Sequence, residues 1–257
     1  MQTVLFRDLG RMDYKAAWDF QTAVHTQLVN GKLQRRHEPA TNTAPPHELI
    51  FVEHAPVFTL GKSGSMAHLL LDELDLAARG VQFYPINRGG DITFHGPGQI
   101  VGYPILDLEC FFTDVHRYVR HLEEIIIRTL ADFGVVGSRI PSYTGVWIET
   151  PPNRDLESAE AAFFSQKRKI CAIGVHLSRW VSLHGFAFNI NTDLRYFDYI
   201  VPCGIRDEDK SVTSLARELG RFVEPESVKS RLKIHFAELF SCNLQEVAPQ
   251  TIPAHHE

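Results

Sequence analysis

Cysteine is scarce in this chain and is never closely paired. The four cysteines among 257 residues are widely spaced, no Cys-x-x-Cys pair occurs, and no Asn-x-Ser/Thr glycosylation triplet is present. A disulfide scaffold or a zinc finger would need cysteines at closer, regular spacing. The pattern predicts a protein of a reducing compartment, and we expect it to be cytoplasmic.

Excess charge of one sign and long apolar runs are also missing. The 26 basic and 31 acidic residues give a net charge of -5, which argues against a nucleic-acid partner. No stretch reaches the length of a membrane span, so we expect no membrane partner. With 44% hydrophobic residues, the chain is predicted to form a single domain over residues 1–257, with an ordered core at about 4–245 and a tail at 249–257.

Common nucleotide and metal motifs are absent as well. Gly61-Lys62-Ser63 resembles the end of a phosphate-binding P-loop, but Pro56 stands where that loop needs its first glycine. The thirteen histidines include no His-Glu-x-x-His, so they predict no metal site. We interpret His54, His176 and His184 as hydrogen-bonded packing residues.

What the chain does contain is a set of strand and helix patterns in irregular alternation. The clearest helix is expected at 115–133, where an apolar stripe recurs at helical spacing and Gly134 can end the helix. Further helices are expected at 13–29, 211–219 and 225–240, and strands at 48–53, 81–86, 100–108, 145–149, 169–178 and 181–190. The polar run 150–166 is expected to be exposed. This order predicts an α+β domain with a mixed β-sheet packed by helices.

Residues 88–99 form the most informative segment, with the sequence RGGDITFHGPGQ. Its glycines let backbone approach a bound molecule, and Arg88, Thr93, His95 and Gln99 supply polar groups. An ordinary turn before the apolar run 100–108 would explain the glycines alone. A second cluster around Cys203, with the sequence IVPCGI, favours a ligand site.

Cys203 is the cysteine whose position suits chemistry. It follows a proline and precedes a glycine at the start of a charged loop, so it stands at a chain reversal. Cys171 alternates with apolar residues on a predicted strand and Cys242 ends a predicted helix, so both have packing explanations, while Cys110 is ambiguous.

A nucleophilic cysteine needs a neighbour that favours its thiolate form, and Lys169 is the candidate. Strand alternation places Lys169 on the same side as Cys171, so that its stem points toward packed surface. The alternative is that Lys169 merely begins a strand after the basic residues 167 and 168, within a solvated cluster.

Together these segments resemble the bacterial octanoyltransferases of lipoate synthesis, the LipB family, from about residue 4 to residue 220. The resemblance rests on four ordered motifs: Arg88–Gln99 with Tyr103 following, Arg168–Gly174, Leu183–Ala187 and Ile200–Ile205. It implies a fold similar to the catalytic domain of biotin and lipoate protein ligases. It also implies a two-step octanoyl transfer that uses no metal and no other cofactor.

The resemblance also implies roles for individual residues. The acyl-thioester nucleophile falls on Cys203, and the lysine that lowers the thiol pKa falls on Lys169. The acyl pocket falls on three segments: Arg88, Gly89, Gly90, Asp91, Ile92, Thr93, Phe94 and His95; Ala172, Ile173 and Gly174; and Gly185, Phe186 and Ala187.

The implied partners are proteins that carry acyl groups. The donor is octanoyl-acyl carrier protein, and the acceptors are the lipoyl domains of 2-oxoacid dehydrogenase E2 subunits and the glycine cleavage H protein. Two other hypotheses are kept: an ATP-dependent lipoate or biotin-type protein ligase on the same fold, and a non-catalytic acyl-binding protein in which Cys203 is incidental.

Overall fold

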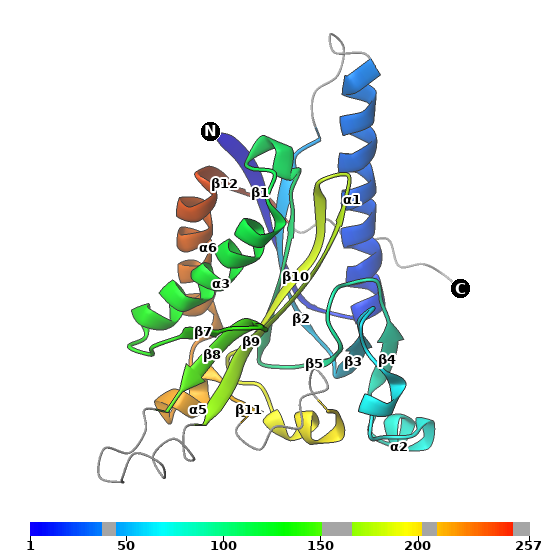
Figure 1. The fold of residues 1–257 in the computed structure, drawn as a ribbon, viewed down its shortest axis with the longest axis vertical. Helices are drawn as coiled ribbons and strands as arrows, with labels where there is room; N and C mark the ends of the chain where they lie inside the picture. The colour runs from blue at the N-terminus through cyan, green and yellow to red at the C-terminus, as the bar shows by residue number, and fades with distance from the viewer. Residues whose placement is uncertain (38–44, 151–165, 202–209, 249–257) are drawn as a thin grey trace.

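The structure is a computed structural model that describes residues 1–37, 45–150, 166–201 and 210–248. Within these residues, nine strands form one large sheet (Figure 1). Across the sheet the strands follow the order β12 (Cys242–Glu246), β1 (Gln2–Met12), β2 (His47–His54), β6 (Gln99–Ile105), β10 (Val181–Asn189), β9 (Lys167–Ser178), β8 (Tyr143–Glu149) and β7 (Ser138–Ile140), with β11 (Lys210–Val212) paired to β9.

Strand pairs in this sheet run in both senses. β1 is parallel to both β12 and β2, and β11 is parallel to β9. The pairs from β2 through β6, β10, β9 and β8 to β7 are antiparallel. The predicted α+β class with a mixed sheet is therefore confirmed.

Helices cover both faces of the large sheet (Figure 1). On one face lies α1 (Tyr14–His37), which packs Ala17 and Leu28 against apolar residues of β2, β6 and β10. On the other face lie α3 (Val115–Asp132) and α6 (Pro225–Phe240), which enclose the larger core cluster. The short helix α5 (Leu215–Leu219) precedes α6 and buries Leu215.

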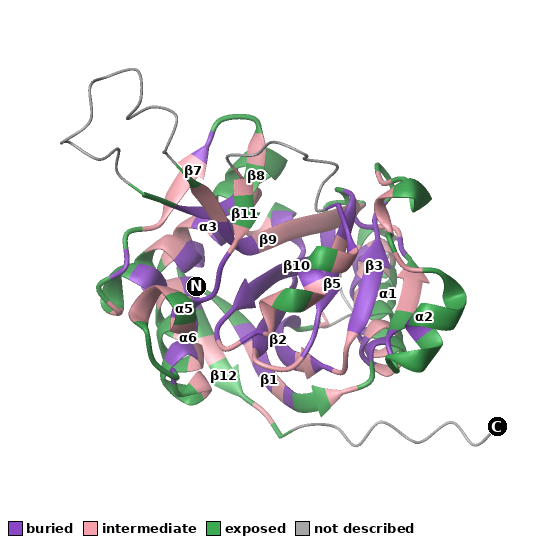
Figure 2. Ribbon diagram, turned by 90° about the horizontal axis from the view of Figure 1, so that it is seen from below, coloured by how far each residue is buried: buried purple, intermediate pink, exposed green. Residues whose placement is uncertain are grey.

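A second, three-stranded sheet stands beside the first. Its order is β4 (Gln82–Pro85), β3 (Val57–Leu60) and β5 (Ile92–His95), with β3 parallel to β4 and antiparallel to β5. Phe58, Phe94 and Phe197 form its core, and α2 (Glu73–Ala78) lies outside it. Figure 2 shows β3 buried and α2 largely exposed.

The predicted helix at 115–133 is confirmed almost to the residue. The Asp114 carboxylate accepts a hydrogen bond from the Arg117 N–H and begins α3. Gly134 follows its end with φ of 76°, a conformation that glycine adopts without strain. Tyr118, Leu122, Ile125, Ile126 and Leu130 of this stripe are fully buried.

Two expected helices have different bounds, and one strand was not expected. The helix expected at 13–29 continues to His37, since Lys32 is buried by an ion pair with Asp107 at 2.7 Å. β1 was not expected, since its Arg7 is buried against Glu48 at 2.7 Å. The helix expected at 211–219 begins only at Leu215, because residues 210–212 pair with β9 as β11.

Two segments with expectations from the sequence lie largely beyond the part of the chain that the structure describes. The polar run 150–166 and the tail 249–257 lie almost entirely outside the described residues. Among the described residues, no helix is both long and apolar enough to cross a membrane.

Candidate active site

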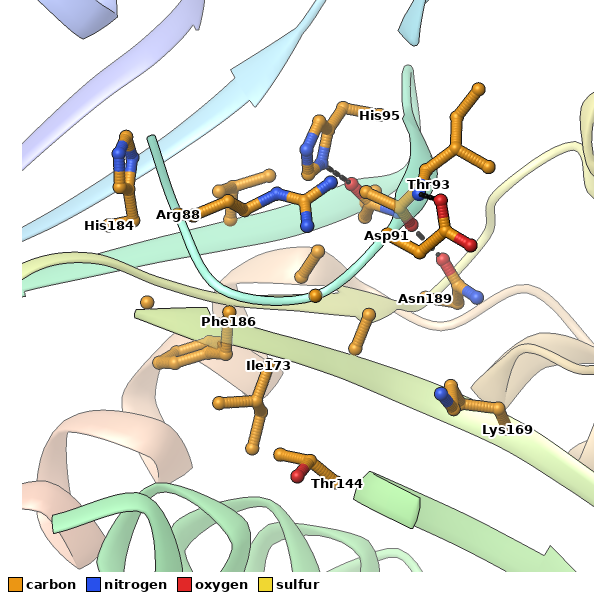
Figure 3. A pocket seen from close by; sticks show the side chains of 18 of the residues that line it. Arg88, Asp91, Thr93, His95, Thr144, Lys169, Ile173, His184, Phe186 and Asn189 are labelled. Atoms are coloured by element: carbon orange, nitrogen blue, oxygen red, sulfur yellow. Dashed lines mark hydrogen bonds between the residues drawn. The ribbon is translucent and has the colours of Figure 1, made fainter. Parts of the chain in front are cut away.

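A cavity of about 380 Å³ lies between the glycine-rich segment 88–95 and strands β9 and β10. This volume falls in the range of small-molecule sites. Figure 3 shows side chains from these elements around one space, with His184 and Lys169 at opposite ends of the view. Most of the residues expected to form the acyl pocket line it: Arg88, Gly90, Asp91, Ile92, Thr93, His95, Ala172, Ile173, Gly174, Gly185, Phe186 and Ala187.

Gly89 and Phe94 were expected in the pocket but do not line the cavity. The Phe94 ring instead stacks on Tyr196 with ring centroids 4.4 Å apart, within the core of the small sheet. The Gly89 N–H donates a hydrogen bond to the Val175 carbonyl at 3.0 Å, which attaches the loop to β9. Both residues therefore support the segment that lines the cavity, Gly89 through β9 and Phe94 through the core of the small sheet.

Two glycines in the sheet allow neighbouring backbone to come close, at Gly174 from the loop and at Gly185 from the adjacent strand. A Cβ on Gly174 would lie 2.8 Å from the Gly89 carbonyl oxygen, and a Cβ on Gly185 would overlap the Gly102 carbonyl of the adjacent strand. Only glycine fits at these two points, because a real Cβ does not approach another heavy atom so closely. Backbone and small side chains of Ala172, Gly174, Gly185 and Ala187 therefore form part of the cavity lining.

Arg88 fixes the loop to the small sheet. Its guanidinium donates to the Thr59 carbonyl at 2.7 Å, the Thr59 hydroxyl at 3.0 Å and the Gly89 carbonyl at 3.0 Å. The side chain is only 8% exposed, so these charge-assisted hydrogen bonds replace the water that a buried cation loses. Arg88 thus both lines the cavity and sets the path of its wall.

Asp91 connects the loop to the chain that leads toward Cys203. Its carboxylate contacts His68 Nδ1 at 2.5 Å and accepts the Ile92 N–H at 2.7 Å. The His68 carbonyl in turn accepts the Val201 N–H at 2.8 Å. Cys203 itself lies outside the described residues.

Lys169 lines the cavity, but for a different reason from the one expected. β8 and β9 shift register between Val146, which faces Cys171, and Trp147, which faces Lys169. Ile170 and Cys171 consequently both pack into the core, as consecutive residues do at a β-bulge. The expectation that Lys169 and Cys171 share one side of β9 was therefore wrong, because the extra residue reverses the alternation. Lys169 is turned toward the cavity instead.

The other cysteines are poor nucleophiles. Burial raises the pKa of the Cys171 thiol far above its ordinary value, and it raises the pKa of Cys242 to about 11. Burial and the nearby Asp107 carboxylate also raise the pKa of Cys110. All three side chains are free thiols, and each remains protonated near neutral pH.

The cavity wall also contains Asn189 and Tyr143, two polar residues that the sequence did not single out. Asn189 accepts a hydrogen bond from the Gln99 amide at 2.9 Å and donates one to the Thr213 carbonyl at 3.0 Å, and Gln99 in turn pairs with His95 Nδ1 at 2.9 Å (Figure 3). Tyr143 of β8 lines the same cavity. An aromatic residue on a strand reads as core, so the sequence carries no signal for it.

His95 and His184 line the cavity and His54 contacts Tyr103 of its wall, and all three are buried and neutral. His54 Nε2 hydrogen-bonds the Tyr103 hydroxyl at 2.9 Å, and His184 Nε2 hydrogen-bonds Asn87 at 2.7 Å, which confirms their interpretation as hydrogen-bonded packing residues. Burial lowers the pKa of His54 to about 4 and that of His184 to about 3. Burial also lowers the pKa of His95 well below its usual range.

Known proteins resemble this chain along almost its whole length. Residues 13–237 match the family model described as the lipoyl protein ligase A/B catalytic domain. The octanoyltransferase of Flavobacterium psychrophilum is 52% identical over 246 residues, which cover 95% of this chain and 99% of that protein. The chain belongs to the octanoyltransferase family. An octanoyltransferase of Cytophaga hutchinsonii is 49% identical, with 97% and 98% of the two chains covered.

Solved structures show the same fold at lower identity. A bipartite lipoate protein ligase from Thermoplasma acidophilum superposes with a TM-score of 0.63 at 14% identity, covering 98% of this chain and 88% of that one. A lipoate-protein ligase A bound with ATP gives a TM-score of 0.63 at 15% identity, covering 98% and 90%. The expected similarity to lipoate protein ligases is confirmed for the fold. The expectation that this chain is a transferase enzyme is confirmed by its octanoyltransferase relatives.

The buried histidines predict that stability falls in mild acid. A histidine whose pKa is about 4 when folded and about 6.5 when unfolded binds its proton first in the unfolded chain, so its contribution is complete above about pH 6.5 and is lost as the pH falls toward 4. For His54 we expect the free energy of unfolding to drop by about 2 kcal/mol between neutral pH and about pH 5. Urea titrations at the two pH values measure this drop.

A matched pair of variants tests whether His54 is a source of this pH dependence. His54→Gln should reduce the pH dependence, whereas His116→Gln, at an exposed position of α3, should leave it unchanged. Equal unfolding free energies of the unmodified protein at both pH values would contradict neutral, buried histidines at this site.

Proposed function

We propose that this enzyme moves an octanoyl group from octanoyl-acyl carrier protein to a lysine of a lipoyl domain, through a thioester on Cys203. The observation that carries the proposal is the cavity, with Lys169 at one end of it (Figure 3). The described chain leads into and out of the segment 202–209 close to this cavity. Val201 is tied to His68 at one side, and Val212 pairs with Lys169 at the other. Cys203 follows Val201 by two residues, a reach of about 7 Å.

The first step transfers the acyl group to the enzyme. The Cys203 thiolate attacks the thioester carbonyl of the octanoyl-carrier protein, a new carbon–sulfur bond forms, and the bond to the carrier sulfur breaks. The carrier thiolate leaves and takes a proton from the Lys169 ammonium. The octanoyl chain then lies in the cavity, against the small residues Ala172, Gly174 and Ala187.

The second step delivers the acyl group to its acceptor. The uncharged amine of a lipoyl-domain lysine attacks the octanoyl-enzyme carbonyl, an amide bond forms, and the Cys203 thiolate leaves. Lys169, which lost its proton in the first step, accepts one from the attacking nitrogen. The enzyme returns to its starting protonation state, so the cycle balances without any added reagent.

Electrostatics favour Cys203 over the other cysteines for this role. An unperturbed thiol has a pKa of about 8.5. To lower that pKa by about two units, the surroundings must stabilise the thiolate over the thiol by roughly 2.7 kcal/mol. An ammonium group within a few ångströms supplies an interaction of this size. Lys169 is directed at the cavity, whereas the pKa values of Cys110, Cys171 and Cys242 are all raised.

The partners follow from the two half-reactions. The donor is octanoyl-acyl carrier protein, and the acceptors are the lipoyl domains of 2-oxoacid dehydrogenase E2 subunits and of the glycine cleavage H protein. The free thiols of Cys110, Cys171 and Cys242 suit a reducing compartment, so we place the enzyme in the cytoplasm. We also propose that residues 1–257 act as one catalytic domain, because the large sheet joins elements from β1 to β12.

The two alternatives are less well supported. An ATP-dependent ligase would activate a free acid, and a thioester donor makes that activation unnecessary. The lipoate ligases of known structure share only 14–15% identity with this chain, so they speak for the fold alone, whereas the octanoyltransferases are about half identical over nearly its full length. A passive acyl-binding protein would need no buried lysine directed at its cavity.

Intact-mass analysis tests the proposal directly. Incubation with octanoyl-acyl carrier protein, without ATP, should add one octanoyl group to the protein, and peptide mapping should place it on Cys203 as a thioester that hydroxylamine removes. Added lipoyl domain should then discharge it. Acylation that requires ATP, or no acylation, would contradict the proposal.

Two cysteine variants serve as a matched pair in that assay. Cys203→Ala should form no acyl-enzyme while keeping its melting temperature, whereas Cys110→Ala should acylate normally. Full turnover by Cys203→Ala would remove this residue from the mechanism.

Lys169→Ala tests the activation of the thiol. Loss of the ammonium group should raise the apparent pKa of Cys203 by about two units, so that its alkylation by iodoacetamide near neutral pH slows by about tenfold. Lys167→Ala, on the same strand but absent from the cavity lining, is the control and should keep the normal profile. An unchanged profile for Lys169→Ala would separate Lys169 from the thiol.

A further inference from the structure

Lys169 rests on an aromatic ring that no step of the proposed mechanism uses. Its Nζ atom lies 4.6 Å from the ring centroid of Trp147, within the distance of a cation–π interaction. Trp147 is 1% exposed and Lys169 is 8% exposed, so the contact is formed away from bulk water. Such contacts are strongest when the cation is desolvated.

The Trp147 ring is itself held in place. Its Nε1–H donates to the Tyr143 carbonyl at 3.4 Å, and the Trp147 and Tyr143 rings meet edge to face with centroids 6.0 Å apart. The register shift between β8 and β9 makes Trp147 the direct cross-strand neighbour of Lys169. The ring therefore meets Lys169 through the sheet ladder and does not depend on a flexible loop.

A buried carboxylate supports the strand at the same point. Glu123 of α3 is 1% exposed and accepts the Gly145 N–H at 3.1 Å, while its other oxygen binds Arg120 at 2.6 Å and Arg139 at 3.0 Å. Gly145 has φ of 118°, and a Cβ there would lie 2.5 Å from the Cys171 carbonyl oxygen. These contacts fix β8 against β9 beside the bulge.

We infer that Trp147 is a positioning residue for Lys169: its ring stabilises the positive charge of the ammonium group and directs that group into the cavity. This inference rests on the proposed role of Lys169 beside Cys203. The ring replaces part of the hydration that Lys169 loses on burial. Through Lys169, it helps to keep Cys203 in the thiolate form.

Titratable groups of the surrounding elements bear on any pH measurement at this site. They are Glu123 of α3, Tyr143 of β8, Cys171 of β9, and Lys210 of β11, whose Nζ lies 4.8 Å from the Tyr143 ring. Burial holds Cys171 protonated, so it does not contribute a thiolate near neutral pH. The reporter is therefore the alkylation of Cys203, followed by peptide mapping.

Trp147→Leu should raise the midpoint pH of Cys203 alkylation by about one unit, because the cation–π contribution is removed. The rate should return to that of the unmodified enzyme well above the midpoint, where the thiol ionises without help. A merely structural defect would lower the rate at every pH without moving the midpoint. Trp147→Phe keeps an aromatic face and should show a smaller shift in the same direction.

A double-mutant cycle decides whether Trp147 acts through Lys169. If it does, Trp147→Leu combined with Lys169→Ala should have the same midpoint as Lys169→Ala alone. Trp180→Leu is the matched control, because Trp180 is 36% exposed at the turn between β9 and β10 and does not line the cavity. Its profile should equal that of the unmodified enzyme.

Two results would overturn the inference: equal midpoints for Trp147→Leu and the unmodified enzyme, or a further shift of full size when Trp147→Leu is added to Lys169→Ala. Either result is distinct from failure of the proposed function. That failure would appear as no octanoyl thioester on Cys203 of the unmodified enzyme, whatever the variants do.

Discussion

One extra residue in β9 determines that Lys169 faces the cavity. Regular pairing of β8 and β9 would put Lys169 and Cys171 on the same side of the strand, but the bulge sends Ile170 and Cys171 together into the core and turns Lys169 to the cavity. A buried ammonium group is costly unless its surroundings replace water. The Trp147 ring does so in part, and β8 is held beside the bulge by Glu123.

The cavity also depends on the close approach of backbone segments. Glycines at 174 and 185 leave room for the backbone of neighbouring segments, and Arg88 fixes the glycine-rich loop through hydrogen bonds to Thr59 and Gly89. The Asp91–His68 contact links that loop to the chain that enters the Cys203 segment. The wall of the cavity and the attachment of the chain that leads toward Cys203 thus depend on one set of contacts.

Much of this could be predicted from the sequence where local pattern and tertiary packing agree. The stripe of α3, the strands around residues 169–190 and the pocket-forming glycines all have local signals. The sequence carries no local signal for the side of β9 on which Lys169 lies, because a bulge depends on pairing with another strand. The length of α1 and the strand at Arg7 were missed since Lys32 and Arg7 are buried only by virtue of distant carboxylates. The sequence did not single out Trp147, because nothing in β8 alone points to Lys169.

The central claim is that Lys169 and Cys203 meet at one end of the acyl cavity. Its most direct test is an experimental structure of the enzyme carrying an octanoyl group on Cys203. The account predicts the acyl chain between the segment 88–95 and strands β9 and β10, with Lys169 Nζ within about 6 Å of the Cys203 sulfur. An acyl chain outside this cavity, or a Lys169 side chain turned into the core beside Cys171, would contradict it.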